Sequence, residues 1–344
     1  MKKRILYIDI LNIIACICVV AMHCNGIVHM FSNSRAWKTS LLVETLAYWA
    51  VPVFFMITGA TLLDYTKKYS TRKYMKKRVE KTVIPFLVWS IFFLVVGIHT
   101  GTWKLSDLTP LKIVSMIFNS QVNVLYWFFP AMFTVYLGIP VFAHLKEESR
   151  DKILNYLIAY GLVMVSIVPC ICTILGIPFN ASFSPAVCGG YMLLVLIGYK
   201  LANTPLDKKA RCMIYVCGIA GWAIRFFGTL YGSMKIGDLD KTFWGYCNFP
   251  SVMLSIAVFV WFKYHDWSKL ERNNRCQKAI GAISGCSFGI YLLHYLFIWQ
   301  LPIKYGIHID SWQWRILGTI GIYLVSLLIV YIIKKIPVVK KIVP

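Results

Sequence analysis

The sequence predicts an all-α protein, a helix bundle that crosses a membrane about ten times with both termini in the cytoplasm. Hydrophobic residues make up 58% of the 344 residues, and charged residues only 15%. Apolar runs recur from end to end, each about as long as the roughly 20 residues that a spanning helix needs. Most of the 36 Lys and Arg residues fall in alternate loops, and such loops face the cytoplasm.

These spans account for most of the chain. The net charge of +22 follows from the basic cytoplasmic loops and does not indicate nucleic-acid binding. We expect one membrane domain over 5–333, followed by a basic cytoplasmic tail at 334–344. The expected spans cover roughly 5–30, 41–63, 82–99, 122–143, 153–175, 185–201, 212–231, 244–262, 280–301 and 312–333.

The first span carries an unusual polar stripe. At 100° per residue, Asp9, Asn12, Cys16 and His23 lie within about 60° of one another on a helix. Asn12 and His23 are separated by roughly 16 Å along the axis. Because polar groups are costly in lipid, the stripe should face the bundle interior or a water-filled cavity. A helix with a few satisfied polar groups packed on its neighbours is the simpler alternative.

Two further motifs follow the first span. In the second span Pro52 can interrupt the helix, and Thr58-Gly59 permits close packing or a bend. The basic segment 64–81 predicts an amphipathic helix on the inner membrane face that continues into the next span. There Arg78 and Lys81, three residues apart, bind either lipid headgroups or the phosphates of a cytoplasmic ligand.

Aromatic residues dominate the outer segments. Leu111, Val114 and Phe118 recur at helical spacing, which predicts a short interfacial helix. Trp127 belongs to the run at 126–129, which is either an aromatic belt or a stacking platform for a sugar.

The later spans hold isolated polar residues. Arg225, in the seventh span, must find a carboxylate, carbonyls or water, and Glu44 is one candidate partner. Ser287, Tyr291 and His294 share one face of the ninth span. The eleven cysteines show no zinc spacing, and we expect no metal and no bound cofactor.

Together these motifs resemble the acyltransferase-3 family of integral membrane O-acyltransferases. The resemblance covers nearly the whole chain in the right order. Asn12 stands where the family has a basic residue, Thr58 where it has serine, and Lys81 where it has a second arginine. The matching motifs are Tyr7-Ile8-Asp9 with His23, Pro52 to Gly59, Arg78 to Phe86, Trp127-Phe128, and Ser287 to His294.

The resemblance implies a reaction and its substrates. An acyl group would pass from cytoplasmic acyl-CoA, expected to be acetyl-CoA, to a hydroxyl of an extracytoplasmic polysaccharide or lipid-linked sugar, as in polysaccharide O-acetylation. The setting would be a bacterial cytoplasmic membrane, with membrane lipids and other glycan-synthesis proteins as further partners. Arg78, Lys81 and the position of Asn12 would bind the donor.

The histidines are the candidate catalysts. His23 is expected to be a general base for the acceptor hydroxyl, since an ordinary histidine pKa of about 6.5 allows it to accept a proton at neutral pH. His294 is a second candidate, as a base or as an orienting donor. Asp9 lies about 21 Å from His23 along the helix axis, so it cannot complete a triad, and we expect it to anchor a cytoplasmic arginine.

Two other classes of function use the same features. A transporter or exporter of a polar substrate would use the polar stripe to line its path and would catalyse no reaction. A non-catalytic membrane partner of a glycan-synthesis complex would tolerate Asn12 in place of the basic residue. Only the enzyme requires acyl-CoA and leaves an ester on the acceptor.

Overall fold

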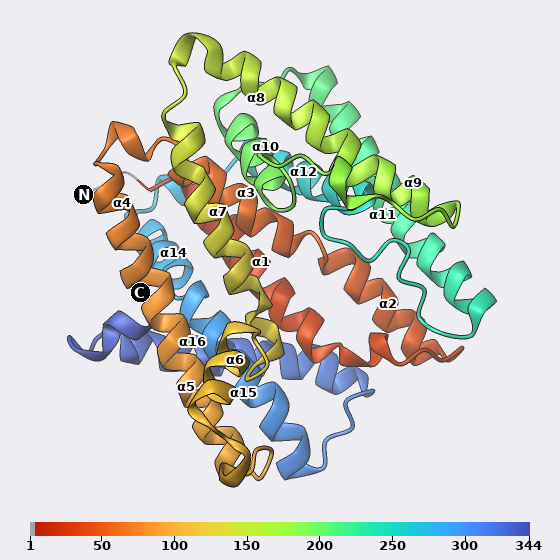
Figure 1. Cartoon of the computed structure of the whole chain (residues 1–344), viewed down its shortest axis with the longest axis vertical. Coiled ribbons are helices and arrows are strands. Elements are labelled where there is room, and N and C mark those ends of the chain that lie inside the picture. Colours follow the sequence, from red (N-terminus) through yellow and green to blue (C-terminus); the bar gives the residue numbers. More distant parts are fainter. Residues whose placement is uncertain (1–3) are drawn as a thin grey trace.

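The computed structural model describes residues 4–344, which form helices and contain no β-strand. Figure 1 shows a bundle in which α1 lies near the middle. The helices are α1 Leu6–Cys24, α2 Arg35–Ala47, α3 Ala50–Leu62, α4 Thr71–Arg78, α5 Ile84–His99, α6 Pro110–Phe118, α7 Phe128–Ala143, α8 Glu147–Gly161, α9 Val168–Ile174, α10 Met192–Asn203, α11 Lys208–Ile236, α12 Phe249–Tyr264, α13 Ser268–Glu271, α14 Asn274–Ser284, α15 Ser287–Tyr305 and α16 Thr319–Ile333.

The all-helical membrane bundle is confirmed. Among the described residues, 7 helices are long and apolar enough to cross a membrane, or 8 if the bent pair α14–α15 is one span. The other two predicted spans coincide with α10 and α12, of 12 and 16 residues. Both are shorter than the roughly 20 residues of an upright span. Ten spans and cytoplasmic termini therefore stay predictions.

The helix α1 is the central element. It packs against α3 and α12 on one side and against α14, α15 and α16 on the other. Accordingly, Leu11 and Val19 belong to one cluster of buried apolar side chains, and Cys16 and Val20 to the other. A helix that is surrounded in this way can bury polar groups, because neighbouring helices can satisfy them.

Local sequence explains where the helices bend. The segment Thr71–His99 is continuous, as the sequence predicts, and a π-helical turn at Val79–Val83 joins α4 to α5. The predicted single span 280–301 is wrong as one helix, because α14 and α15 meet at 52°. The break falls at Gly285-Cys286. Pro52 lies in the first turn of α3, where proline is tolerated.

Close packing of α3 on α10 depends on glycine. A Cβ on Gly59 would lie 1.9 Å from the carbonyl oxygen of Val195, and one on Gly198 would lie 2.2 Å from that of Met56. No side chain fits at either distance, so the two backbones touch at these positions. Thr58 donates its hydroxyl to the Phe54 carbonyl at 2.9 Å, within its own helix.

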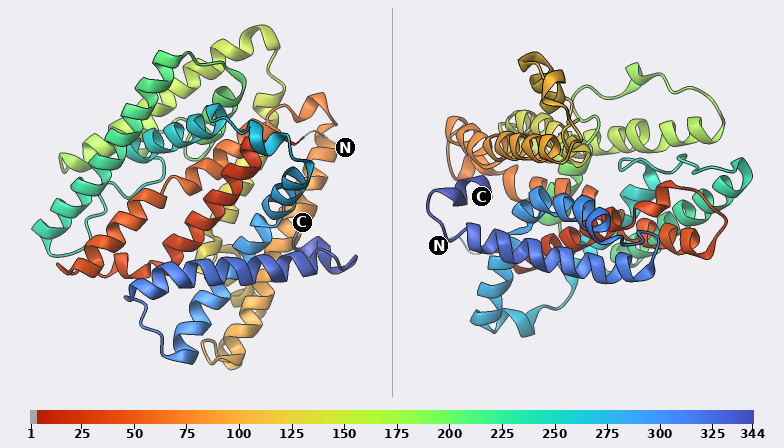
Figure 2. Two further views of the ribbon diagram at one scale, coloured as in Figure 1. Left: turned by 180° about the vertical axis from the view of Figure 1, so that it is seen from behind. Right: turned by 90° about the horizontal axis from the view of Figure 1, so that it is seen from below.

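The loops predicted to be basic meet at one end of the bundle. Arg150 pairs with Asp64 at 2.9 Å, and Lys263 donates to the carbonyls of Leu201 and Thr204 at 2.6 and 2.9 Å. Both views in Figure 2 place the start of α1 near the C-terminal end of the chain.

The basic tail is packed against this end of the bundle. The carbonyl of Ile342 accepts a 3.0 Å hydrogen bond from the Trp89 indole, and Val343 is fully buried. At the other end the predicted short helix is present as α6, and its position at the membrane interface stays a prediction. Its apolar residues Leu111 and Phe118 are about 80% exposed, as expected for a helix that lies on a membrane surface.

Candidate active site

The polar stripe of α1 faces the break between α14 and α15. Asn12 donates its amide to the hydroxyls of Ser284 and Ser287 at 3.0 and 3.1 Å, and to the Ser284 carbonyl at 3.0 Å. Cys16 contacts the Ser287 carbonyl at 3.7 Å. These bonds occupy the Asn12 amide donors, so this side chain joins two helices and has only its carbonyl oxygen to offer to a ligand.

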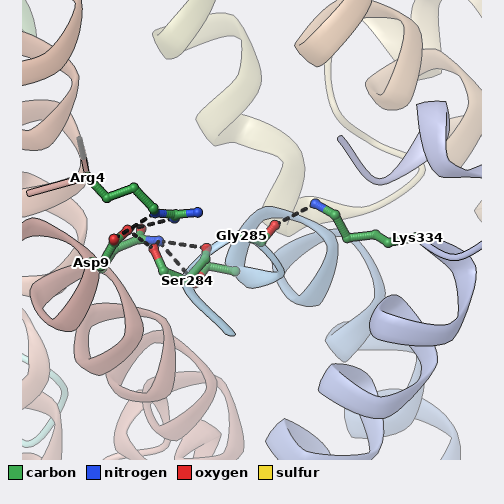
Figure 3. A network of polar contacts seen from close by, with 7 residues as sticks. Arg4, Asp9, Ser284, Gly285 and Lys334 are labelled. Carbon is green, nitrogen blue, oxygen red and sulfur yellow. Dashed lines mark hydrogen bonds and ion pairs between the residues drawn. The ribbon is translucent and has the colours of Figure 1, made fainter. Parts of the chain in front are cut away.

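A charged network surrounds the contact between α1 and the α14–α15 break, which we call the joint (Figure 3). The Arg4 guanidinium holds both carboxylate oxygens of Asp9 at 2.7 and 2.8 Å, which gives Asp9 an arginine partner. The Ser284 hydroxyl also donates to Asp9 at 2.8 Å. From the other side Lys334 donates to the Gly285 carbonyl at 2.7 Å. The break between α14 and α15 is therefore fixed by side chains from both ends of the chain.

The two candidate histidines are hydrogen-bonded to each other. His23 Nδ1 lies 2.7 Å from His294 Nε2, and the two ring planes are nearly parallel, with an interplanar angle of 19°. His294 Nδ1 lies 2.8 and 3.1 Å from the carbonyls of Tyr291 and Ile290. Because carbonyl oxygens only accept hydrogen bonds, His294 Nδ1 carries the proton and its Nε2 is the acceptor.

This arrangement fixes the protonation of His23 in the neutral pair. Its Nδ1 must donate to His294, so the lone pair is on its Nε2. His23 Nε2 makes no hydrogen bond with any of residues 4–344, and His23 lines a cavity, whereas His294 is completely buried. The outer histidine therefore offers a bare nitrogen to the cavity, and the inner one supports it.

The cavity connects the two ends of the stripe. It has a volume of about 190 Å³ and lies between α1, α3, α7 and α15. Asn12 and His23 both line it, so it extends over roughly 16 Å of α1. Other residues contribute to its wall: Thr58, Thr82, Tyr136, Ser287 and Tyr291.

Arg78 stands at the Tyr136 wall of the cavity. Its guanidinium lies 5.2 Å from the ring centre of Tyr136 and 5.6 Å from that of Tyr74. Arg78 Nε is buried without a hydrogen-bond partner in the described chain. A buried guanidinium donor without an acceptor is costly. An anionic group bound beside Tyr136 would supply the missing acceptor.

Three further cations gather near the α14–α15 joint. Lys81 is exposed and directly precedes the lining residue Thr82. Burial lowers the pKa of the Lys334 ammonium, and the positive charges of Lys81 and Arg4 act in the same direction. Such mutual repulsion marks a site where an anion would be stabilised.

Aromatic rings form the wall near His23. The Trp127 ring stacks on Tyr246 with centres 5.5 Å apart, and Tyr246 stacks on Tyr48 at 4.3 Å. The hydroxyl of Tyr291 donates to the Leu125 carbonyl. Trp127 therefore lies in the bundle at the cavity, and not only in a belt at its surface.

Arg225 belongs to a separate buried cluster and does not line this cavity. It donates to the Phe243 carbonyl at 2.6 Å and to Ser251 at 2.9 Å, and its guanidinium lies 3.3 Å from the Tyr48 ring centre. Within residues 4–344 no ion pair joins it to Glu44. Of the partners that the sequence left open, a carbonyl is present, together with a hydroxyl and an aromatic face.

Sequence reasoning missed three residues of the site. Lys334 reads as a stop signal after the last span, and only the fold brings it to Gly285. Tyr136 and Tyr246 sit in ordinary apolar spans, and no spacing rule distinguishes them from packing residues. The aromatic content of their spans was the only available signal.

Comparison with known proteins identifies one match. The acyltransferase-3 family model, described as an acyltransferase domain, matches residues 5–334. Neither the curated proteins nor the solved structures yield a match.

Proposed function

Since the chain belongs to the acyltransferase-3 family and is thus a membrane acyltransferase, we propose that it transfers an acyl group from cytoplasmic acyl-CoA to a hydroxyl of an extracytoplasmic glycan or lipid-linked sugar. Acetyl-CoA is the proposed donor, and the proposed setting is the bacterial cytoplasmic membrane.

One observation carries the proposal: the His23–His294 hydrogen bond of 2.7 Å at a cavity shared with Asn12. A general base needs a free lone pair, a partner that fixes its orientation and access to the substrate. His23 has all three, because its Nδ1–H donates a hydrogen bond to His294 and the lone pair on its Nε2 faces the cavity. A transporter has no need for such an oriented imidazole pair.

The pair performs the reaction without net loss of protons. His23 Nε2 takes the proton of the acceptor hydroxyl as the hydroxyl oxygen attacks the thioester carbonyl carbon. The carbon–sulfur bond then breaks, and the CoA thiolate receives the proton from the His23 imidazolium. During both steps the His23 ring keeps its Nδ1 proton and donates it in a hydrogen bond to His294 Nε2, which stabilises the imidazolium. The products are an ester and free CoA thiol.

The donor, acyl-CoA, binds at the end of the bundle that carries the basic loops. The phosphates of CoA carry several negative charges, and Arg78, Lys81, Arg4 and Lys334 surround the joint and the cavity mouth. The unpaired Nε of Arg78 is a suitable phosphate donor. From there the thioester would extend along the cavity past Asn12 towards His23.

The test compares glycans from cells with and without the protein by mass spectrometry. The proposal expects one acyl unit per modified sugar to vanish on deletion and to return with the wild-type chain. Purified protein in detergent should release CoA thiol only when both acyl-CoA and the glycan are present. Movement of an unmodified substrate without any need for acyl-CoA would support the transporter instead.

A further inference from the structure

A second cavity opens at the end of the bundle that holds α6 and the last turns of α5 and α15 (Figure 1). It has a volume of about 220 Å³ and the mechanism above does not use it. Its lining contains aromatic rings and amides but no charged side chain: Phe93, Trp103, Gln121, Asn123, Tyr295 and Trp299.

The two indoles of this cavity make no polar contact and stack on no other ring in the described chain. Trp103 and Trp299 are half-buried, and in the described chain neither side chain makes a hydrogen bond or a ring contact. By contrast, Tyr295 packs on Phe93 with ring centres 6.3 Å apart. The Trp299 ring and the indole N–H groups of both residues therefore have no partner in the described chain, whereas the Trp103 ring also packs on Gly97.

An unpaired amide points to the same conclusion. Asn123 is only 2% exposed, and its Oδ1 accepts the Leu125 N–H at 3.0 Å. In the described chain no hydrogen bond is formed by its Nδ2, and the neighbouring Tyr126 hydroxyl donates its own proton to the Leu292 carbonyl at 2.9 Å. A buried amide donor left unpaired costs about 1–3 kcal/mol, which a ligand oxygen would recover.

The second cavity shares a wall with the first. Val124 lines the second cavity, and the next residue, Leu125, lines the first. On α15 Tyr295 lines the second and Tyr291 the first, about 6 Å apart along the axis. His294 lies between these two tyrosines in the chain. A molecule in the second cavity is therefore one layer of side chains from the histidine pair.

We propose that the second cavity is a subsite that binds one pyranose ring of the acceptor. The apolar face of a pyranose packs on an aromatic ring face, and its hydroxyls both donate and accept, which matches the amides of Asn123 and Gln121. The uncharged lining selects against an anionic headgroup. Sugar binding stands on this geometry alone, whereas naming the sugar as part of the acceptor rests on the proposed function.

Binding is tested by saturation-transfer NMR on the whole protein in detergent. The probes are methyl α-D-glucopyranoside and methyl N-acetyl-β-D-glucosaminide, with cyclohexanol as the non-sugar control. At least one pyranoside should bind the wild type and lose at least fivefold in signal with Trp299→Ala. Gly97→Ala should act similarly, because its new Cβ would lie 2.4 Å from the Trp103 indole. Trp312→Ala, at a tryptophan 58% exposed outside this cavity, should have no effect.

Two results would overturn the subsite: no saturation transfer from the wild type to either pyranoside, or equal transfer from the wild type and from Trp299→Ala. A transfer assay then separates this inference from the proposed function. Trp299→Ala should raise the acceptor KM about tenfold and leave the donor KM unchanged. Pyranoside binding without any acyl transfer by the wild type would refute the enzyme and the acceptor assignment together. An unchanged acceptor KM despite lost binding would refute the acceptor assignment alone.

Discussion

The amide nitrogen of Asn12 lies 3.1 Å from the hydroxyl of Ser287, across the contact between α1 and α15. The same nitrogen also reaches Ser284, on the other side of the break between α14 and α15. One side chain of α1 thus holds the end of α14 and the start of α15 in register. Eleven residues further along α1, that register brings His23 to His294.

Replacing Asn12 tests this joint. We expect Asn12→Leu to lower the free energy of unfolding by about 1–3 kcal/mol, because it leaves buried serine oxygens unpaired, and to reduce acyl transfer by displacing His23. Asn12→Arg retains hydrogen-bond donors and should leave activity unchanged or lower the donor KM. Thermal melts in detergent and CoA-release assays measure both effects. Equal stability of Asn12→Leu and wild type would refute a structural role.

The glycine contact between α3 and α10 gives a second prediction. Gly59→Ala should abolish folding or sharply lower the yield of inserted protein, because its Cβ meets the Val195 carbonyl at 1.9 Å. Gly321→Ala is the matched control, since nothing lies within 4 Å of its Cβ, and alanine in place of a helical glycine should stabilise by about 0.5–1 kcal/mol. Size-exclusion profiles of the two variants distinguish them, and a monodisperse Gly59→Ala protein with a normal melting temperature would contradict the packing.

The donor site gives a third prediction. The double variant Arg78→Ala with Lys81→Ala should raise the KM for acyl-CoA at least tenfold, because phosphate contacts are lost, while kcat changes little. The control removes the same charge from exposed positions of α4 by Arg72→Ala with Lys73→Ala. If both double variants alter the donor KM equally, or neither does in detergent, the basic segment serves lipid headgroups instead.

The sequence predicts much of α1 and little of its partners. Helical spacing alone places Asp9, Asn12, Cys16 and His23 on one face, and the structure directs all four to α14 and α15. The pairing of His23 with His294 could not be predicted, because the two residues are 271 positions apart and periodicity describes only one helix at a time.

Breaks and short helices escape the same reasoning. Gly285 interrupts α14–α15 without a proline to signal it, and a hydropathy window reads through it. The 12-residue α10 also looks like a full span when the apolar residues before it are counted. Arg225 contacts Phe243 and Tyr48, which reach it only through the fold, so the sequence could not decide between a carboxylate and carbonyls as its partner.

His294 is predicted to orient His23 and not to bind substrate. His294→Leu should lower kcat by about tenfold or more, because the His23 ring loses the acceptor that fixes its tautomer, with the donor KM unchanged. Tyr305→Leu, at an exposed tyrosine of the same helix that lines neither cavity, is the control and should leave kcat unaffected. A larger rise in KM than fall in kcat would assign His294 to substrate binding.

The most direct test of the account is acyl transfer by His23→Ala, with His29→Ala as the control because His29 is an exposed histidine beyond the end of α1. Both purified variants are assayed for CoA release with acyl-CoA and glycan, and both are expressed in the deletion background for glycan mass spectrometry. We expect His23→Ala to insert and fold normally and to lose transfer by roughly 10²–10⁴-fold, the usual contribution of a general base, while His29→Ala retains wild-type transfer. Full glycan acylation by a well-expressed His23→Ala protein would contradict the account and remove His23 from the mechanism.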